Sequence, residues 1–298
     1  MATQQQRAVR RGIGILSAFL LMFALIAWLL TFFGNGFQGS PWSSAIGVVE
    51  VQGVIDDSEE IIESIRHFAK ADHIHAIILR IESPGGAVTP SQEIYRELFR
   101  LRDQKPVIAS LGEVAASGGY YIASACTTIM ANPGTITGSI GVIMGTLYNV
   151  QGLLEKLGIK GTVVKSGSYK DIGSSIRDMT PEEREILKAM LDDVHKQFIA
   201  AVAMGRKMDE AAVQPLADGR IYSGEQAQQL GLVDQLGNFQ DAIALAAEKA
   251  GISGEPRLIH ARTQKKTWWR QLLSLWLGEM LSKGELGPRL FFLGPQLS

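Results

Sequence analysis

Residues 76–86 read AIILRIESPGG, and residues 107–119 read VIASLGEVAASGG. Each segment begins with an apolar, β-rich run, AIILRI at 76–81 and VIASL at 107–111, and ends in glycines. This pattern is typical of a buried strand followed by a tight turn. Amphipathic helical patterns at 58–71 and 90–102 separate these runs from one another and from an earlier strand-like run that begins at Ile46. Strands that alternate with helices predict βα units, and therefore an α/β fold.

The second half of the chain contains the clearest helix signal. Thr180 precedes a proline and two glutamates at the start of the long stretch 180–208, so we expect a helix that is capped by Thr180. A turn-rich segment at 218–237 and a shorter helix at 239–250 follow. The run TVVK at 162–165 predicts a further strand, which leads into a loop rich in glycine and serine.

The chain begins with a candidate membrane anchor. Residues 12–34 contain no charged side chain, and as a helix they would extend about 34 Å, against a hydrocarbon core of about 30 Å. A cleavable signal peptide is the alternative, but its apolar stretch is typically only about 7–15 residues. Arg7, Arg10 and Arg11 precede the span, so the positive-inside rule places residues 1–11 in the cytoplasm and the rest beyond the membrane.

Composition divides the remainder into three parts. Residues 35–45 are uncharged and rich in glycine and serine, which suits a linker. We expect a folded domain at 46–262 and a basic amphipathic tail at 263–298. The tail holds three of the five tryptophans beside basic residues, which favours contact with a membrane surface. Packing on this chain or on a neighbouring copy, and disorder, are the alternatives for the tail.

Charge and cysteine content exclude several classes of protein. A net charge of −1 leaves no excess of basic side chains, so we expect no nucleic acid partner. The single cysteine, Cys126, excludes an intramolecular disulfide and a cysteine-rich zinc site. A hydrophobic content of 46% is sufficient for a substantial core, and therefore for a globular domain.

Ser117 is a candidate nucleophile because it stands between a predicted strand end and a predicted helix start. Free N–H groups at such a junction stabilise a developing oxyanion. Gly118 would supply one N–H group, and Gly85 or Gly86 in the SPGG segment would supply the other. In the alternative interpretation Ser117 caps a helix, the glycines serve packing, and SPGG is an ordinary tight turn.

A nucleophilic serine needs a general base, and none of the histidines is well placed for that role. Their positions favour surface or structural roles: His67, His73, His75, His195 and His260. Lysine can replace histidine where burial lowers its pKa enough to give a neutral amine near neutral pH. The candidate is Lys170 in the loop KSGSYKDIG at 165–173, although a loop lysine is more often simply solvated.

Five segments, in this order, resemble the signal peptide peptidase A family. They are SPGG at 83–86, ASGGYYIA at 116–123, TGSIGV at 137–142, SYKDIGS at 168–174 and DGRIYSGEQA at 218–227. The resemblance implies a crotonase-like or Clp-protease-like α/β core of repeated ββα units. It also implies that Ser117 is the nucleophile and Lys170 the general base. Ser139 matches a serine that orients the lysine, and Gly86 and Gly118 match the two oxyanion donors.

The resemblance is to the short form of this family, which has one catalytic unit. It implies a serine endopeptidase, anchored in the plasma membrane with its catalytic domain outside the cytoplasm, that degrades remnant signal peptides and other hydrophobic peptides. It implies no metal and no organic cofactor. Such proteins assemble into homo-oligomeric rings, in which Ser117 and Lys170 can come from neighbouring copies. A crotonase-like acyl-CoA enzyme and a non-catalytic membrane scaffold are the alternative functions.

Overall fold

The computed structural model of the protein describes residues 21–26, 44–261 and 291–293. The chain divides into two units, one up to Ser43 and one from Ser44 onward. In the first unit only the helical residues 21–26 are described, so most of the predicted anchor at 12–34 lies outside the described residues. Within the described ranges, no helix combines the length and the apolar character that a membrane crossing requires.

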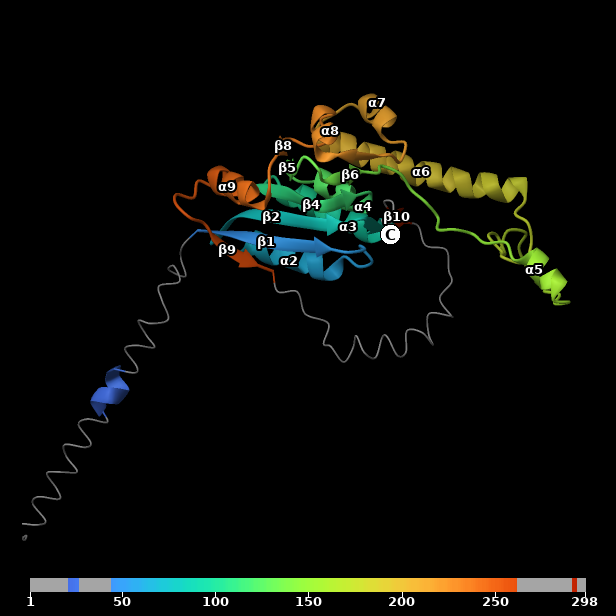
Figure 1. Ribbon diagram of the computed structural model, residues 1–298, viewed down its shortest axis with the longest axis horizontal. Helices are drawn as coiled ribbons and strands as arrows, with labels where there is room; N and C mark the ends of the chain where they lie inside the picture. The colour runs from blue at the N-terminus through green and yellow to red at the C-terminus, as the bar shows by residue number, and fades with distance from the viewer. Residues whose placement is uncertain (1–20, 27–43, 262–290, 294–298) are drawn as a thin grey trace, which may run out of the picture. The chain divides into compact units, whose positions relative to one another are not determined.

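The folded domain is built around a mostly parallel sheet (Figure 1). Its main path follows the order β7-β6-β4-β2-β1-β9. These strands are β1 (Ala45–Gln52), β2 (Ile74–Ser83), β4 (Val107–Ala116), β6 (Ile136–Gly138), β7 (Ile221–Ser223) and β9 (Arg257–His260). Beside this path, β5 (Thr128–Ala131) pairs with β4 and with β8 (Gln235–Leu236). Only β6 and β7 pair antiparallel within this described sheet, so the sheet is mixed.

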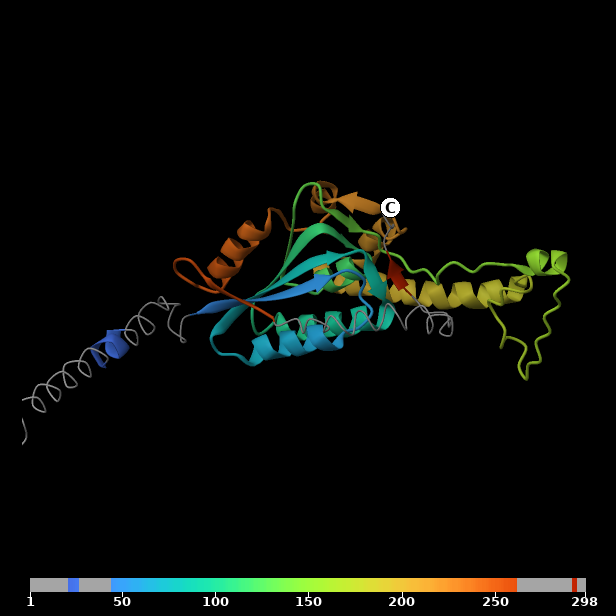
Figure 2. The same ribbon diagram turned by 60° about the horizontal axis from the view of Figure 1, so that its bottom comes forward.

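The two faces of the sheet bury separate hydrophobic clusters, because successive side chains of a strand point to opposite faces. In β2, Ile77 and Leu79 belong to one cluster, whereas Ile78 belongs to the other. Helices α2 (Glu59–Lys70), α3 (Val88–Leu101) and α4 (Gly118–Ser124) cover the first face, and α9 (Phe239–Lys249) covers the second (Figure 2). Burial on both faces explains why the strands read as continuous apolar runs. The predicted α/β fold is confirmed.

Helix α6 (Pro181–Arg206) begins as predicted, with a capping box at Thr180. The Oγ1 of Thr180 accepts a hydrogen bond from the N–H of Glu183, and the Glu183 side chain accepts one from the N–H of Thr180. The fully buried apolar residues of helix α6 begin at Phe198, and Val194, one turn earlier, packs against the core while only partly buried. Its first part therefore projects from the domain.

This first part of α6 belongs to an extension that we call the arm, residues 143–197, and that includes α5 (Gln151–Lys156). The arm reaches away from the sheet in both views (Figures 1 and 2). Only Glu183 is buried in it. We call the remainder of the domain, residues 44–142 and 198–261, the body.

Smaller elements complete the domain. The turn-rich segment at 218–237 contains β7, α8 (Gly224–Gln229) and β8, and it follows α7 (Glu210–Val213) and the 3₁₀ helix η1 (Gln214–Leu216). A separate two-stranded sheet joins β3 (Gly85–Ala87) to β10 (Phe291–Leu293) in antiparallel pairing. Apart from β10, the predicted tail at 263–298 lies outside the described residues.

Two predictions of local structure were wrong. Strand β4 does not end at Leu111 but continues to Ala116, because its last residues pair with β6. The run at 162–165 forms no strand: Val163 and Val164 are 48% and 95% exposed. A strand needs a neighbour for its N–H and C=O groups, and the described part of the arm contains no other strand.

Candidate active site

Three neighbouring strands, β2, β4 and β6, end at one edge of the sheet. Because they run parallel, the segments that follow them also gather at this edge. These segments contain Gly85 and Gly86, then Ser117, then Ser139. Residues from three distant segments of the sequence are thus brought together by the order of the strands.

Ser117 occupies the junction between β4 and α4 in a strained conformation. Its φ of 52° and ψ of −116° lie in a region that costs a residue with a Cβ about 1–3 kcal/mol. Its N–H donates to the carbonyl of Gly138 at 2.8 Å, and its carbonyl accepts from the N–H of Tyr121 at 2.7 Å. These hydrogen bonds hold the backbone in the conformation that directs the Ser117 side chain.

The hydroxyl of Ser117 is buried and has no hydrogen-bond partner. A buried hydroxyl without a partner costs about 1–3 kcal/mol, so such groups are rare in native proteins and call for an explanation. Although Ser117 stands at the N-cap position of α4, its side chain makes no capping hydrogen bond. Helix capping therefore does not explain this serine, and none of the five histidines is hydrogen-bonded to its Oγ.

The glycines beside Ser117 are required by close backbone contacts. A Cβ on Gly118 would lie 3.1 Å from the nitrogen of Gly86, so these two backbone segments are adjacent. A Cβ on Gly86 would lie 2.1 Å from the carbonyl oxygen of Ile55. Gly85 has a φ of 111°, which strongly favours glycine. The backbone geometry at these positions therefore leaves no room for a side chain.

The N–H of Gly86 faces the edge on which β10 lies. Ile55 occupies the opposite edge, since its N–H donates to the carbonyl of Gly85 and its carbonyl accepts from the N–H of Ala87. Backbone groups of successive strand residues point to alternate edges, so those of Gly86 point away from Ile55. Phe292 is the residue of β10 that pairs with Gly86.

Ser139 follows β6 and lies beside the Ser117 turn. Its φ is 53°, its N–H donates to the carbonyl of Arg220 at 2.9 Å, and it is 5% exposed. Gly138, the residue before it, accepts the hydrogen bond from the N–H of Ser117. The structure therefore brings Ser139 and Ser117 to adjacent strand ends.

Lys170 is not part of this cluster within one copy of the chain. It lies in the arm, it is exposed, and it is not hydrogen-bonded to Ser117, whose Oγ has no partner. Its own N–H donates to the carbonyl of Gly167 at 3.1 Å. Arg177 is not among the candidates from the sequence. Its Nε donates at 2.8 Å to the carboxylate of Asp171, the residue after Lys170. The capping box at Thr180 was the signal that could have led to this ion-pair network.

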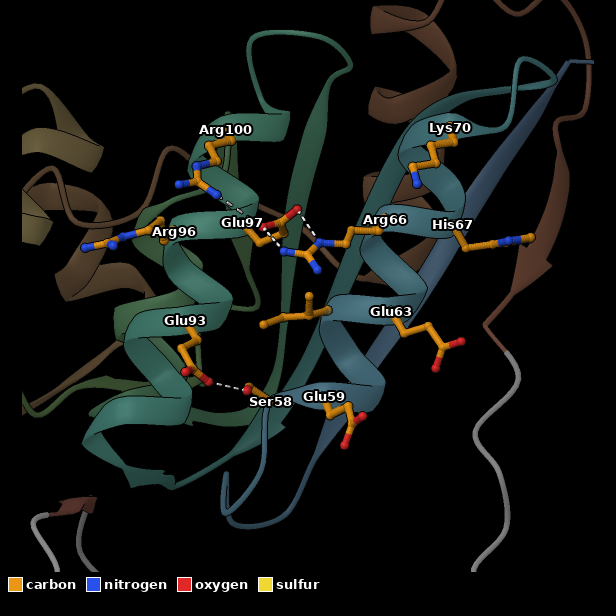
Figure 3. Close-up of a pocket in the computed structure, with 11 residues that line it drawn as sticks. Ser58, Glu59, Glu63, Arg66, His67, Lys70, Glu93, Arg96, Glu97 and Arg100 are labelled. Carbon is orange, nitrogen blue, oxygen red and sulfur yellow. Dashed lines mark hydrogen bonds and ion pairs between the residues drawn. The ribbon is translucent and has the colours of Figure 1, made fainter.

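A charged groove lies elsewhere, between α2 and α3, with a volume of about 830 Å³ (Figure 3). Its walls carry both signs of charge, and Arg66 pairs with Glu97 at 2.9 Å across it. Hydrogen bonding by Arg66 lowers the pKa of Glu97. None of the candidate catalytic residues lines this groove. In the described part of the chain, no three His, Cys, Asp or Glu side chains form a group suited to a metal ion.

Comparison with known proteins identifies the family. Residues 100–253 match peptidase family S49, and residues 47–135 match the Clp protease family. The chain is 47% identical over 209 residues to a Synechocystis protein that carries the name of a protease, covering 70% of this chain and 75% of that protein. It is 36% identical over 215 residues to the chloroplastic serine protease SPPA of Arabidopsis thaliana, and 38% identical over 215 residues to protease 4 of Salmonella typhi.

These two matches cover 72% and 69% of this chain but only 32% and 34% of the respective relatives. The chain thus spans about a third of these longer proteins and three quarters of the Synechocystis protein. The Clp protease match agrees with the α/β fold and its mixed sheet. On this evidence the chain belongs to peptidase family S49, the family of the SppA signal peptide peptidases.

Proposed function

We propose that this family member is a membrane-anchored serine endopeptidase that cleaves remnant signal peptides and other hydrophobic peptides. Ser117 is the nucleophile, and Lys170 of a neighbouring copy is the general base. Ser139 orients the lysine, and the N–H groups of Gly86 and Gly118 stabilise the oxyanion. The apolar span at 12–34 anchors the domain outside the cytoplasm.

The hydroxyl of Ser117 is the observation that carries this proposal. It is buried, unpaired and held on a strained strand-to-helix turn beside Gly86 and Gly118. Strain and missing hydrogen bonds persist where the surrounding structure fixes them, and they concentrate at functional sites. A base that approaches this hydroxyl would complete its hydrogen bonding and would accept its proton.

A second copy of the chain is the source of that base in this proposal. The arm that carries Lys170 exposes large apolar side chains: Ile143, Leu147, Tyr148, Leu153, Leu157, Ile159, Val163, Val164 and Tyr169. A group of exposed apolar residues of this kind marks an interaction surface. Contact with the body of a second copy would cover these side chains and would also remove water from the amine of Lys170. Loss of hydration favours the neutral amine, which is the form that acts as a base.

The edge of β3 supports a peptide as the substrate. An extended segment, β10, already pairs with Gly85–Ala87 and also contacts α4, the helix that follows Ser117. Peptides often bind proteins by adding a strand to an exposed edge in this way. A substrate strand on the same edge would bring its carbonyl to the N–H of Gly86. This arrangement favours peptide hydrolysis over acyl-CoA chemistry.

The proposed reaction has two steps. The Oγ of Ser117 attacks the peptide carbonyl while its proton passes to the neutral amine of Lys170, and the oxyanion is held by two N–H groups. The intermediate then expels the amine of the leaving peptide, which takes the proton from Lys170. Water, activated by the same lysine, attacks the ester on Ser117. Its hydrolysis releases the second peptide and restores both side chains.

The roles of the two residues are tested by mixing inactive variants of the full chain. Ser117→Ala and Lys170→Ala should each abolish cleavage of a hydrophobic peptide that carries a fluorescent leaving group. Co-expressed in equal amounts and purified through two different tags, they should recover about a quarter of wild-type activity. This fraction follows because a shared site is intact only where a Lys170→Ala copy supplies the serine to a Ser117→Ala neighbour.

Two controls complete this test. Added ethylamine should restore part of the activity of Lys170→Ala, since a small amine can replace a missing base, but should not restore Ser117→Ala. Wild-type turnover in Lys170→Ala would contradict the proposed base. Inactive single variants that recover nothing when mixed would contradict the assignment of the two residues to different copies.

A further inference from the structure

Arg177 is the centre of an ion-pair network in the arm. All five N–H donors of its guanidinium are used. Toward Asp171, Nε donates to the carboxylate at 2.8 Å and Nη2 to the backbone carbonyl at 3.2 Å. Toward Glu183, Nη1 and Nη2 donate to the two carboxylate oxygens at 2.8 and 2.5 Å. The fifth bond, from Nη1, reaches the carbonyl of Asp178 at 3.0 Å.

One side of this network fixes the backbone next to Lys170. Asp171 follows Lys170 directly, and both its carbonyl and its carboxylate are bound by Arg177. Lys165 donates to the same carboxylate at 2.5 Å and to the carbonyl of Ser168 at 2.8 Å. On the preceding side, the N–H of Lys170 donates to Gly167. The backbone is therefore held on both sides of Lys170, while its side chain is exposed to the solvent.

The other side of the network is fixed to a helix. Glu183 stands in the first turn of α6, is only 2% exposed, and closes the capping box with Thr180. Farther along, α6 packs on α4, where the rings of Phe198 and Tyr121 lie 4.8 Å apart. A continuous series of contacts thus runs from the helix beside the nucleophile, along α6, through Arg177, to the loop that carries the base.

Only arginine can connect these groups in this way. Its planar guanidinium binds two carboxylates at once, whereas the ammonium of lysine is a single point of charge. Hydrogen bonds from Arg177 are the main cause that lowers the pKa of Asp171, and they lower that of Glu183 to about 2. Both carboxylates therefore stay ionised at neutral pH, and the network remains intact under the conditions in which a peptidase would act.

We propose that Arg177 is a positioning residue, which joins Asp171 to Glu183 and thereby fixes the direction in which Lys170 presents its amine. Arg177 itself touches neither substrate nor the reacting atoms. The inference rests on the proposed function, since it presupposes that Lys170 is the base. It adds to that proposal a geometric requirement that lies within the arm.

The first test compares the kinetics of the full chain with those of three variants. Arg177→Gln should lower kcat about 100-fold, since small misplacements of a catalytic group have effects of this size. The KM should stay within about twofold, because the peptide binds to the body. Arg177→Lys should recover only part of the loss. Lys188→Gln is the matched control, because it breaks the exposed Lys188–Asp192 pair on the same helix and should leave kcat unchanged.

The second test shows on which side of the shared site Arg177 acts. Co-expression of Arg177→Gln with Ser117→Ala should recover about a quarter of wild-type activity, because the second copy supplies an arm with both Arg177 and Lys170. Co-expression of Arg177→Gln with Lys170→Ala should recover nothing beyond the residual activity of Arg177→Gln. A general loss of folding would lower both mixtures equally.

The outcomes separate this inference from the proposed function. An active Lys170→Ala variant would contradict the base itself. An inactive Lys170→Ala together with a fully active Arg177→Gln would overturn the positioning role alone. The role would also be overturned if Arg177→Gln were found by light scattering to fall apart into single copies, or if its mixture with Lys170→Ala regained activity.

Discussion

The body and the arm of the folded domain are stabilised in different ways. The body buries both faces of its sheet, and its large side chains, such as Tyr120 and Phe198, are fully enclosed. The arm has no fully buried apolar side chain: its apolar residues are exposed or partly buried, and its single buried residue, Glu183, is charged. The body therefore resembles a complete domain, whereas the arm resembles half of an interface.

This difference matters because the proposed nucleophile lies in the body, whereas the proposed base lies in the arm. Ser117 is fixed by the packed body, where the backbone hydrogen bonds around it tolerate little change. The backbone beside Lys170 is held by the ion pairs of Asp171 with Lys165 and Arg177, in a segment without a fully buried apolar side chain. An enzyme arranged in this way would stay inactive as a single copy, since the nucleophile and the base meet only on assembly.

The largest difference between the two regions is expected from matched glycine substitutions. Gly86→Ala places a Cβ 2.1 Å from the carbonyl of Ile55, so β3 must shift and kcat should fall about 100-fold. Gly152→Ala, in α5 of the arm, meets no atom within 4 Å and should keep wild-type activity. It should also stabilise its helix by about 0.5 kcal/mol. The measurements are the turnover number and the thermal unfolding temperature of both variants. Equal effects of the two substitutions would contradict the proposed difference between the packed body and the open arm.

Acid should open the arm before it unfolds the body. Hydrogen bonding by Arg177 lowers the pKa of Glu183 from 4.5 to about 2 and also lowers that of Asp171. A carboxylate whose pKa is lower in the folded than in the unfolded chain stabilises the folded state when the pH is above the unfolded pKa. This stabilisation is lost as the pH falls toward the folded pKa. Between pH 4.5 and about 2, cleavage in the arm should therefore accelerate, roughly tenfold, ahead of cleavage in the body.

Pepsin, which works in this pH range, provides the measurement, with cleavage sites identified by mass spectrometry. The body also contains two carboxylates with a lowered pKa, Glu97 and Asp218. Loss of either ion pair releases no element, because the hydrophobic core already holds the helices that Arg66 and Glu97 join, and because Arg220 is only two residues from Asp218. Simultaneous cleavage of both regions at every pH would show that the ion pairs do not hold the arm.

The smallest effect is expected from deletion of residues 291–298, which removes β10 from the edge of β3. If a peptide substrate uses that edge, an attached strand competes with it, and the deletion should lower KM severalfold. The kcat should not change, because Ser117, the N–H groups of Gly86 and Gly118, and the arm are all retained. A deletion that leaves KM at its wild-type value would exclude the β3 edge as the binding site for peptides.

The sequence was sufficient to locate the central strands of the body and the start of α6 in the arm, although it ended β4 five residues too early. Continuous apolar runs marked the buried strands, and the motif around Thr180 marked the start of α6, because these signals depend on neighbours in the chain. The same reasoning failed at 162–165, where two exposed valines form no strand. Local β propensity says nothing about whether a partner strand is present.

The sequence by itself thus determined the fold class, the family and the identity of the candidate residues, since each of these is encoded in short segments of fixed order. Only the tertiary structure decided which of those residues meet. It gathered Gly86, Gly118, Ser117 and Ser139 at the ends of three parallel strands, and it left Lys170 on the arm with Arg177 beside it. Distances between distant segments follow from strand order and side-chain packing, which no single segment contains.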